Sequence, residues 1–222
     1  MSRPLARLVA HLESWLGVWP PARPVHVVGW FRRDEPGWDG KVYPVAGVGD
    51  GAGLVLSVPP RYAEVVAALG DDLARVEAQV PALVSHPDRP FGRGVFRWSA
   101  APTSLPDAGE WVPPTDPRLP GWLRPFNGDV LVAWDDAGEY AAGVGRKRHD
   151  QHGQELAVAT EPAHQGRGLA RRLVAQATRR VLDEGAVATY LHAPDNHASA
   201  RVAEAAGFPN RGWAVYGLPT AS

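Results

Sequence analysis

Apolar and polar residues alternate along three neighbouring segments in the second half of the chain, which predicts strands over residues 129–134, 139–148 and 154–160. The polar stretches DDAG and HDQHG separate these strands, a pattern typical of an antiparallel meander. Apolar residues then recur at every fourth position, which predicts a helix over residues 168–184. Further along, the pattern predicts a strand over residues 187–193, Asn196 as a helix cap, a short helix over residues 199–206 and a last strand in WAVYGL.

The first half of the chain shows the same two periodicities. They predict helices over residues 5–16 and 62–80 and strands over residues 25–31, 42–48, 54–58 and 94–99. Residues 101–125 hold seven prolines and little periodicity, so we expect a connector or packed irregular loop there, with neither a helix nor a central strand. We therefore predict an N-terminal α/β region over residues 1–115 and a second domain over residues 116–222.

Composition narrows the class of protein. Apolar residues make up 45% of the 222 residues, and no run approaches the roughly 20 apolar residues of a membrane span, so we expect a globular protein without a membrane partner. The first helix contains His11 and Glu13 and lacks a cleavage pattern, which favours a cytoplasmic protein over a secreted one. A net charge of −1 argues against nucleic acid as a partner. The absence of cysteine excludes disulfides, thiolate metal sites and a cysteine nucleophile.

The segment EPAHQGRGLARR, residues 161–172, lies where an apolar strand gives way to a helix. A helix start offers about four backbone N–H groups without an intrahelical partner, together with the positive end of the helix dipole, so it can bind an anion. Gly166 and Gly168 let the backbone approach a phosphate. On these residues alone, phosphate binding and a tight connection are equally good interpretations. A P-loop and a dinucleotide fingerprint both fit poorly, because the first needs Gly-Lys-Ser/Thr and the second needs three glycines in a parallel unit.

The run from Gln165 to Ala170 matches the Q/R-x-x-G-x-G/A signature of the GNAT superfamily of N-acetyltransferases. ELAVAT before it resembles the family's fourth strand, while VATYLHA and NHASARVAEAAGF after it resemble the fifth strand and the helix that ends in Gly-Phe. The resemblance covers residues 128–218. Within the superfamily, Glu-Leu-x-Val-x-Thr and Asn-x-x-Ser also resemble the zwittermicin-resistance type.

This resemblance implies an α/β (α+β) fold. A mixed, largely antiparallel sheet with flanking helices would form the C-terminal half, and a smaller α/β region would precede it. That region either shapes the acceptor site or is a degenerate copy of the same fold, although it contains no second glycine signature.

The resemblance also implies an acetyl-CoA site and the transfer of an acetyl group to a primary amine of a small molecule or protein, by a monomer or a homodimer. The glycine turn would hold the pyrophosphate through Gln165, Gly166, Arg167, Gly168, Leu169, Ala170 and Arg171. The fourth strand would pair with the pantetheine arm through Val158, Ala159 and Thr160. Asn196 and Ser199 would flank the arm on its far side, and Pro194 is consistent with strands that splay to admit it.

Amine attack requires a base, and Glu155 is our candidate. It begins the strand that lines the donor site, at the separation from the glycine turn where some family members carry a catalytic glutamate, and partial burial there would raise its pKa toward neutrality. A solvated residue at the strand edge is the alternative. Many family members place a tyrosine before Gly-Phe, where this sequence has Ala203. The residue that protonates the departing thiolate is therefore less defined. Tyr216 would serve if it faces the cleft, and Ser199 or water are alternatives.

The remaining polar and aromatic residues carry weaker signals. No metal is expected, because His149, His152, His192 and His197 lack ligand spacing and are interpreted as turn and surface residues. The acceptor pocket could be lined by Trp30, Trp38 and Trp98. The missing tyrosine also motivates a non-enzymatic alternative, a CoA-binding regulatory or scaffold protein whose catalytic residues have lapsed. The sequence does not specify the acceptor, because family members share the donor site and differ around it.

Overall fold

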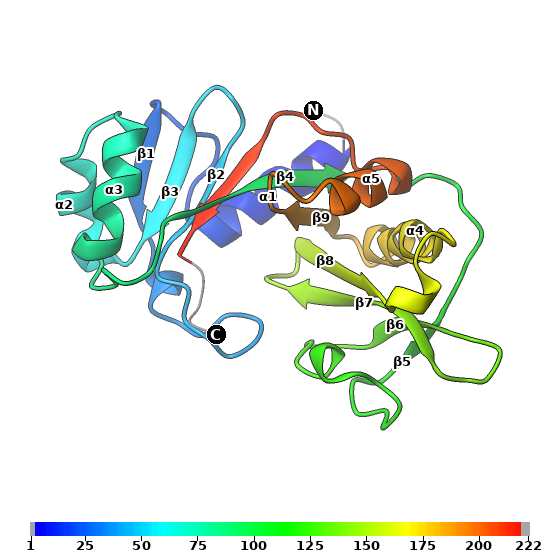
Figure 1. The fold of residues 1–222 in the computed structure, drawn as a ribbon. Coiled ribbons are helices and arrows are strands. Elements are labelled where there is room, and N and C mark those ends of the chain that lie inside the picture. The colour runs from blue at the N-terminus through cyan, green and yellow to red at the C-terminus, as the bar shows by residue number, and fades with distance from the viewer. Residues whose placement is uncertain (1–2, 219–222) are drawn as a thin grey trace.

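The protein has an α+β fold built on one mixed sheet, and its computed structural model describes residues 3–218. The strands are β1 (Val25–Gly29), β2 (Ala46–Gly49), β3 (Leu54–Val58), β4 (Gly92–Ser99), β5 (Glu110–Val112), β6 (Val130–Trp134), β7 (Tyr140–Arg148), β8 (Gly153–Thr160), β9 (Val187–His192) and β10 (Ala214–Gly217). The helices are α1 (Arg3–Leu16), α2 (Ala63–Ala67), α3 (Leu73–Leu83), α4 (Leu169–Asp183) and α5 (His197–Ala206). All ten strands join in the order β1-β3-β2-β10-β4-β9-β8-β7-β6-β5 (Figure 1).

The predicted meander is confirmed. β6 pairs with β7 and β7 with β8, both antiparallel, and the turns fall where the polar stretches predicted them. α4 then carries the chain over one face of the sheet, so β9 returns parallel to β8. Residues 101–125 contain only short elements, the edge strand β5 and one turn of 3-10 helix at Gly121–Leu123, in keeping with a proline-rich segment.

Two predictions in the first half are corrected by the structure. The single helix expected over residues 62–80 is divided into α2 and α3, because Gly70 takes a left-handed φ of 77° and Asp72 starts a new helix by accepting a hydrogen bond from Arg75 N–H. The strand expected over residues 42–48 begins only at Ala46. Pro44 explains the late start, since proline cannot donate to a strand ladder.

The last strand lies in the middle of the sheet. β10 pairs antiparallel with β2 on one side and with β4 on the other, and β4 in turn pairs with β9. The C-terminal strand therefore lies between two strands of the first half, and β4 then pairs that half with β9 of the second half. The predicted boundary near residue 115 stays a prediction, since it falls between β5 and β6 within this continuous sheet.

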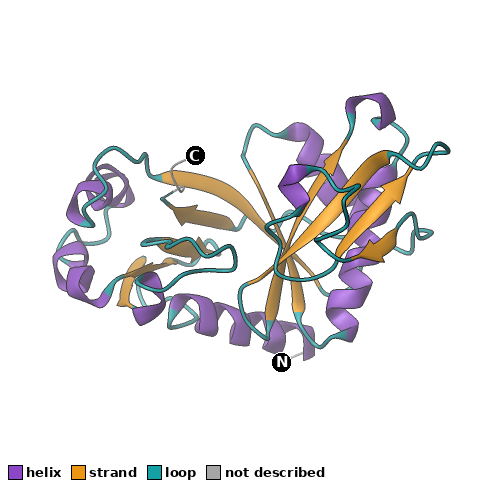
Figure 2. Ribbon diagram, turned by 90° about the horizontal axis from the view of Figure 1, so that it is seen from below, coloured by secondary structure: helices purple, strands orange, loops and turns teal. Residues whose placement is uncertain are grey.

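Helices cover both faces of the sheet. α1 packs on one face against Val48, Val55, Phe96 and Val187, which come from four different strands. α2 and α3 cover the other face over β1, β3 and β10, and α4 with α5 covers that face over β6 to β9. Figure 2 shows the N-terminal end of α1 beside α4, where Arg7 Nη1 donates to the carbonyl oxygen of Leu182 at 3.0 Å. No helix within residues 3–218 combines the length and the apolar character that a membrane crossing requires.

Candidate functional site

β8 and β9 separate halfway along β8, which opens the sheet. Their parallel register runs from Gly153 with Val187 to Leu156 with Tyr190 and stops there, while β7 continues to pair with β8 as far as Thr160. The backbone of residues 157–160 therefore has a free edge on the β9 side. The Thr160 hydroxyl lies at this edge, is buried and has no hydrogen-bond partner within the described chain. An extended chain with amide groups could pair here like an added strand.

The glycine turn lies at the end of the same strand. A 3-10 turn (Pro162–His164) leads into it, Gly166 and Gly168 both take φ of 77°, and Gly168 precedes the first residue of α4. No side chain caps this helix start, so the amides of its first turn keep their donors free. A Cβ at Gly166 would meet no atom within 4 Å, so the backbone there is open to a ligand.

Asn196 and Ser199 form the start of α5 rather than free side chains. The Asn196 Oδ1 accepts the Ser199 N–H at 2.9 Å, which caps the helix. The Ser199 hydroxyl bonds the buried hydroxyl of Tyr190 on β9 at 2.8 Å. Both residues therefore have structural partners, and their contact with a pantetheine arm stays a prediction.

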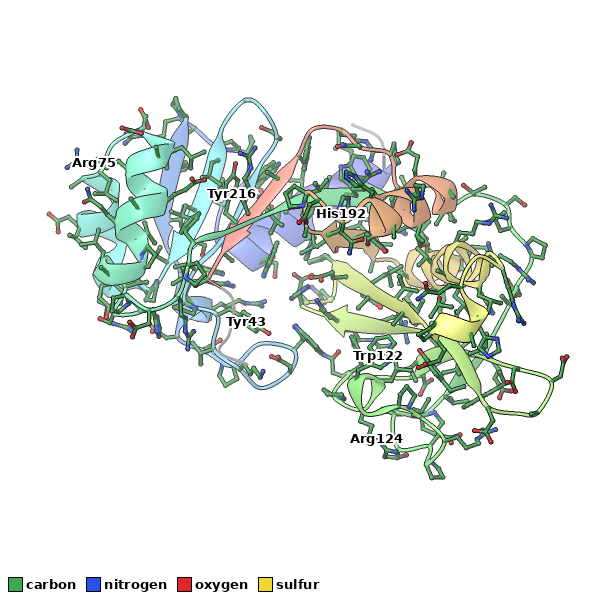
Figure 3. All side chains as sticks on the ribbon, viewed as in Figure 1. Tyr43, Arg75, Trp122, Arg124, His192 and Tyr216 are labelled. Atoms are coloured by element: carbon green, nitrogen blue, oxygen red, sulfur yellow. The ribbon has the colours of Figure 1, made fainter. Side chains whose placement is uncertain are left out.

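A cavity of about 900 Å³ opens between the first-half loops and the ends of the central strands. Its wall combines residues of β2, β4, β9 and β10 with the loop after β1 and the end of β7. Both predicted catalytic residues, Glu155 and Tyr216, line it, and so does His192. Figure 3 shows Tyr216 on β10, His192 at the end of β9 and Tyr43 on the loop that follows β1. The volume is near the upper end of ordinary ligand pockets, which measure roughly 300–1,000 Å³.

Glu155 is held by two basic side chains. Lys147, its direct partner across β7 and β8, places Nζ 2.5 Å from Oε1, and His149 places Nε2 3.1 Å from Oε2. Glu155 itself is only 6% exposed. The interpretation of Glu155 as a solvated residue at a strand edge is therefore wrong.

The expected rise in the pKa of Glu155 is also wrong. Burial alone would raise it, but the charge of Lys147 and the hydrogen bond from His149 outweigh burial and lower the pKa from 4.5 to about 2. The sequence argument considered burial and could not include the two partners. Glu155 is consequently ionised at neutral pH.

A series of ring contacts and one ion pair extends from His149 into the core. The His149 ring contacts Trp15 of α1 at 5.2 Å between centroids, and Trp15 stacks on His11 at 5.7 Å. His11 Nδ1 lies 2.9 Å from the Asp150 carboxylate, and both side chains are almost fully buried. His149 follows β7 directly, so two adjacent residues, His149 and Asp150, tie α1 to the start of β8.

Arg33 is a buried cation of the cavity wall that has no carboxylate partner within residues 3–218. Arg33 is 4% exposed, and its guanidinium donates only to the carbonyl oxygens of Trp15 at 3.0 Å and Tyr43 at 3.4 Å. Its Nε is buried without an acceptor in the described chain. Burial first, and the nearby charge of Arg32 second, lower the pKa of Arg33 to about 10.

Tyr216 and Glu155 approach the cavity from opposite faces of the sheet. Tyr216 packs in the cluster of α2 and α3, whereas Glu155 pairs with Thr189, whose strand neighbours Val187 and Leu191 face α1. The Tyr216 ring lies 6.2 Å from Phe91, and its hydroxyl makes no hydrogen bond with residues 3–218. Ala203, which replaces the family's usual tyrosine, is fully buried in α5.

Sequence reasoning identified part of the cavity wall and missed the rest. Of the three predicted tryptophans, Trp38 lines the cavity, and Trp30 and Trp98 do not. His149 and His192 were expected at the surface, but their exposed fractions are 12% for the His149 side chain and 8% for His192. The spacing of Lys147 and His149 from Glu155 across a predicted hairpin was a usable signal. The sequence held no comparable signal for Arg33, because only folding brings its loop against α1. Within residues 3–218, His, Asp and Glu form no cluster suited to a metal ion.

Sequence comparison places this geometry in a known class. The model of the acetyltransferase (GNAT) family matches residues 94–208, which include β4, the splayed strands and the glycine turn. The chain therefore belongs to the acetyltransferase (GNAT) family. No curated protein sequence matches it.

Solved structures give more distant similarities. They include a GNAT-family protein from Novosphingobium aromaticivorans, 23% identical over 60% of this chain and 66% of that one, with a TM-score of 0.49. A GNAT acetyltransferase from Colwellia psychrerythraea is 15% identical over 65% of this chain and 63% of that one, with a TM-score of 0.45. A GCN5-related N-acetyltransferase-like protein from Streptococcus suis is 16% identical over 74% of this chain and 71% of that one, with a TM-score of 0.44. The chain thus spans about two thirds of the length of the first two.

Proposed function

We propose that this protein transfers the acetyl group of acetyl-CoA to a primary amine held in the cavity. The observation that carries the proposal is the position of Glu155. It lies in the paired part of β8, just before the free edge at residues 157–160, and it also lines the cavity. A donor bound along that edge and an acceptor in the cavity would meet at this carboxylate.

The donor end of the site is supported by its backbone groups. The free edge of Val158, Ala159 and Thr160 offers strand-like hydrogen bonds to the amides of a pantetheine arm. The uncapped start of α4, from Gln165 to Arg171, offers N–H donors to a pyrophosphate. Asn196 and Ser199 would border the arm from the opposite side.

The reaction forms a bond between the amine nitrogen and the acetyl carbon and breaks the bond between that carbon and the sulfur of the thioester. The amine must first lose a proton, and the departing thiolate must gain one. Glu155 is charged and positioned to hold the ammonium by a charge-assisted hydrogen bond. Because its pKa is low, it is a weak proton acceptor by itself.

His149 offers a way to complete the proton transfer. Its Nε2 bonds Glu155, its Nδ1 makes no hydrogen bond with the described residues, and it lines the cavity. Histidine is the side chain that most readily exchanges protons near neutral pH. We therefore infer that Glu155 and His149 act as a pair, in which the carboxylate orients both the amine and the imidazole. Tyr216 lines the cavity and its hydroxyl makes no hydrogen bond with residues 3–218, and we propose it as the donor to the thiolate.

A thiol-release assay with acetyl-CoA and a panel of amino acids, polyamines, aminoglycosides and peptides tests the function. We expect release with at least one amine, and we expect Glu155→Gln to lower kcat by roughly 10²- to 10⁴-fold while the Kd for acetyl-CoA stays the same. Tyr216→Phe should lower kcat only if the hydroxyl donates the proton. Binding of acetyl-CoA without turnover of any amine, in wild type and variant alike, would favour the lapsed CoA-binding protein instead.

The subfamily is a finer proposal. Glu155, Leu156, Val158 and Thr160 on β8 and the pair Asn196 and Ser199 match the pattern of the zwittermicin-resistance type. The amine that acetyltransferases of the zwittermicin-resistance type accept would be added to the same panel. Thiol release with this amine would support the subfamily proposal.

A further inference from the structure

The charges on the cavity wall are unbalanced. Arg32, Arg33 and Arg93 line it without an ion pair to any carboxylate of residues 3–218, whereas Lys147 is neutralised by Glu155 and Arg148 lies 3.7 Å from Glu184. Glu35 is the one carboxylate of the described lining that pairs with no cation. The cavity therefore has an excess of positive charge at the end formed by the loop after β1.

Arg33 is the member of this set whose hydrogen bonds residues 3–218 leave incomplete. A buried cation without a counter-charge is costly, and native structures normally pair it. Two carbonyl oxygens accept from Arg33, so three of its five N–H groups have no acceptor in the described chain, Nε among them. Glu35 does not resolve this deficit, because it is exposed and forms no ion pair with Arg33.

Arg33 is also connected to the proposed reaction centre. Its Nη2 donates to the carbonyl oxygen of Trp15, the Trp15 ring contacts His149, and His149 bonds Glu155. Trp15 and His149 thus lie between the buried cation and the carboxylate that would hold the amine. The wall of the same cavity contains Phe31, Trp38 and Val215, which suit an apolar body.

We propose that the acceptor is a small primary amine that also carries an anionic group, a carboxylate or a phosphate, bound by Arg33 with the neighbouring Arg32 beside it. The inference rests on the proposed function and narrows its substrate class to compounds of the amino-acid kind. The amine would lie at Glu155, the apolar body against the aromatic wall and the anion at Arg33. Arg33 would then act as a residue that determines specificity, because it touches the acceptor and not the reacting atoms.

Matched pairs of amines test this proposal. 6-Aminohexanoate and pentylamine differ only in the carboxylate, and O-phosphoethanolamine and ethanolamine differ only in the phosphate. We expect kcat/KM for thiol release to favour the anionic member of at least one pair by about tenfold or more, the size of one charge-assisted interaction. The pair with the larger ratio identifies the anion.

Variants then assign the preference to Arg33. Arg33→Met should reduce the ratio within the preferred pair by about tenfold, and Arg75→Ala, at an exposed arginine on α3 far from the cavity in Figure 3, should leave it unchanged. If Arg33→Met fails to fold, as judged by thermal unfolding, Arg32→Ala takes its place and should reduce the same ratio.

Three results would overturn the inference. Equal kcat/KM within both pairs would show that the anion is not recognised, while the proposed function would stand. A loss of acetyl-CoA affinity in Arg33→Met with an unchanged ratio would assign Arg33 to the donor. Thiol release with none of the four amines or of the wider panel, despite acetyl-CoA binding, would contradict the proposed function itself.

Discussion

Glu155 illustrates how single residues acquire their properties from neighbours in space. Its sequence position suggested a base with a raised pKa, and burial does act in that direction. Lys147 and His149 reverse the outcome because a buried carboxylate responds strongly to nearby positive charge. The cross-strand pairing of Glu155 with Lys147 follows from the hairpin register. The approach of His149 depends on how the turn after β7 folds against Trp15.

The lowered pKa of Glu155 predicts a pH-dependent contribution to stability. A carboxyl group whose folded pKa lies below its unfolded value of 4.5 stabilises the folded state above pH 4.5 and loses that contribution as pH falls toward about 2. We therefore expect the Tm difference between wild type and Glu155→Gln to be constant from pH 7 to pH 5. Below pH 5, the Tm of the wild type should fall relative to that of the variant. Thermal unfolding across this range measures the effect. A Tm difference that does not change with pH would contradict it.

Gly153 is required by the packing under the site. A Cβ at this position would overlap the His11 ring, which is fixed by its bond to Asp150. Gly153→Ala should therefore destabilise the protein by about 1–3 kcal/mol, the usual cost of overpacking a core. Denaturant unfolding measures the loss. Gly121→Ala is the matched control, because a Cβ there meets nothing within 4 Å, and an equal loss in both variants would refute the argument.

At the scale of elements, two helix starts were recognised from their residues and behave differently. Asn196 caps α5 with its own side chain, as the sequence predicted. α4 begins at Gly168 without a side-chain cap, which leaves its first amides available. Helix boundaries of this kind are local, so glycine, asparagine and the apolar repeat were enough to predict them. The division between α2 and α3 was missed, although Gly70 and Asp72 carried the same kind of signal.

The glycine turn gives an element-scale prediction. Gly166→Leu should lower acetyl-CoA affinity by tenfold or more, because a side chain would cover the free amides at the start of α4. Isothermal calorimetry measures the Kd. Gly51→Leu in the turn between β2 and β3 is the matched control, since both glycines have positive φ and open space around a Cβ. Equal strain of about 1–2 kcal/mol is expected in both variants. Unchanged affinity in Gly166→Leu would place the phosphates elsewhere.

The whole molecule is organised by the placement of β10. This strand fills the gap between β2 and β4, so the last residues of the described chain complete a sheet whose first strands come from the N-terminal region. The cavity depends on the same arrangement, because β10, β2 and β4 form one part of its wall and the end of β7 another. The N-terminal region and the family domain consequently build the candidate acceptor site together.

A continuous sheet predicts cooperative unfolding. We expect one calorimetric transition with equal calorimetric and van't Hoff enthalpies, since separating residues 1–115 from the rest would break the pairing of β10 with both β2 and β4 and that of β4 with β9. Differential scanning calorimetry of the full chain measures this. Two resolved transitions would instead support independent domains on either side of residue 115.

The sequence by itself determined the local structure of the second half. Periodicity identified the meander, α4 and α5, and the glycine signature after β8 indicated the family, because these features depend on residues close together in the chain. Only the tertiary structure decided that β10 lies between β2 and β4, that Arg33 is buried without a counter-charge from the described residues and that Glu155 is held ionised by Lys147 and His149. Each of these depends on burial and on charges brought together from distant segments, and the energy of a charge in a low-dielectric interior is set by such neighbours.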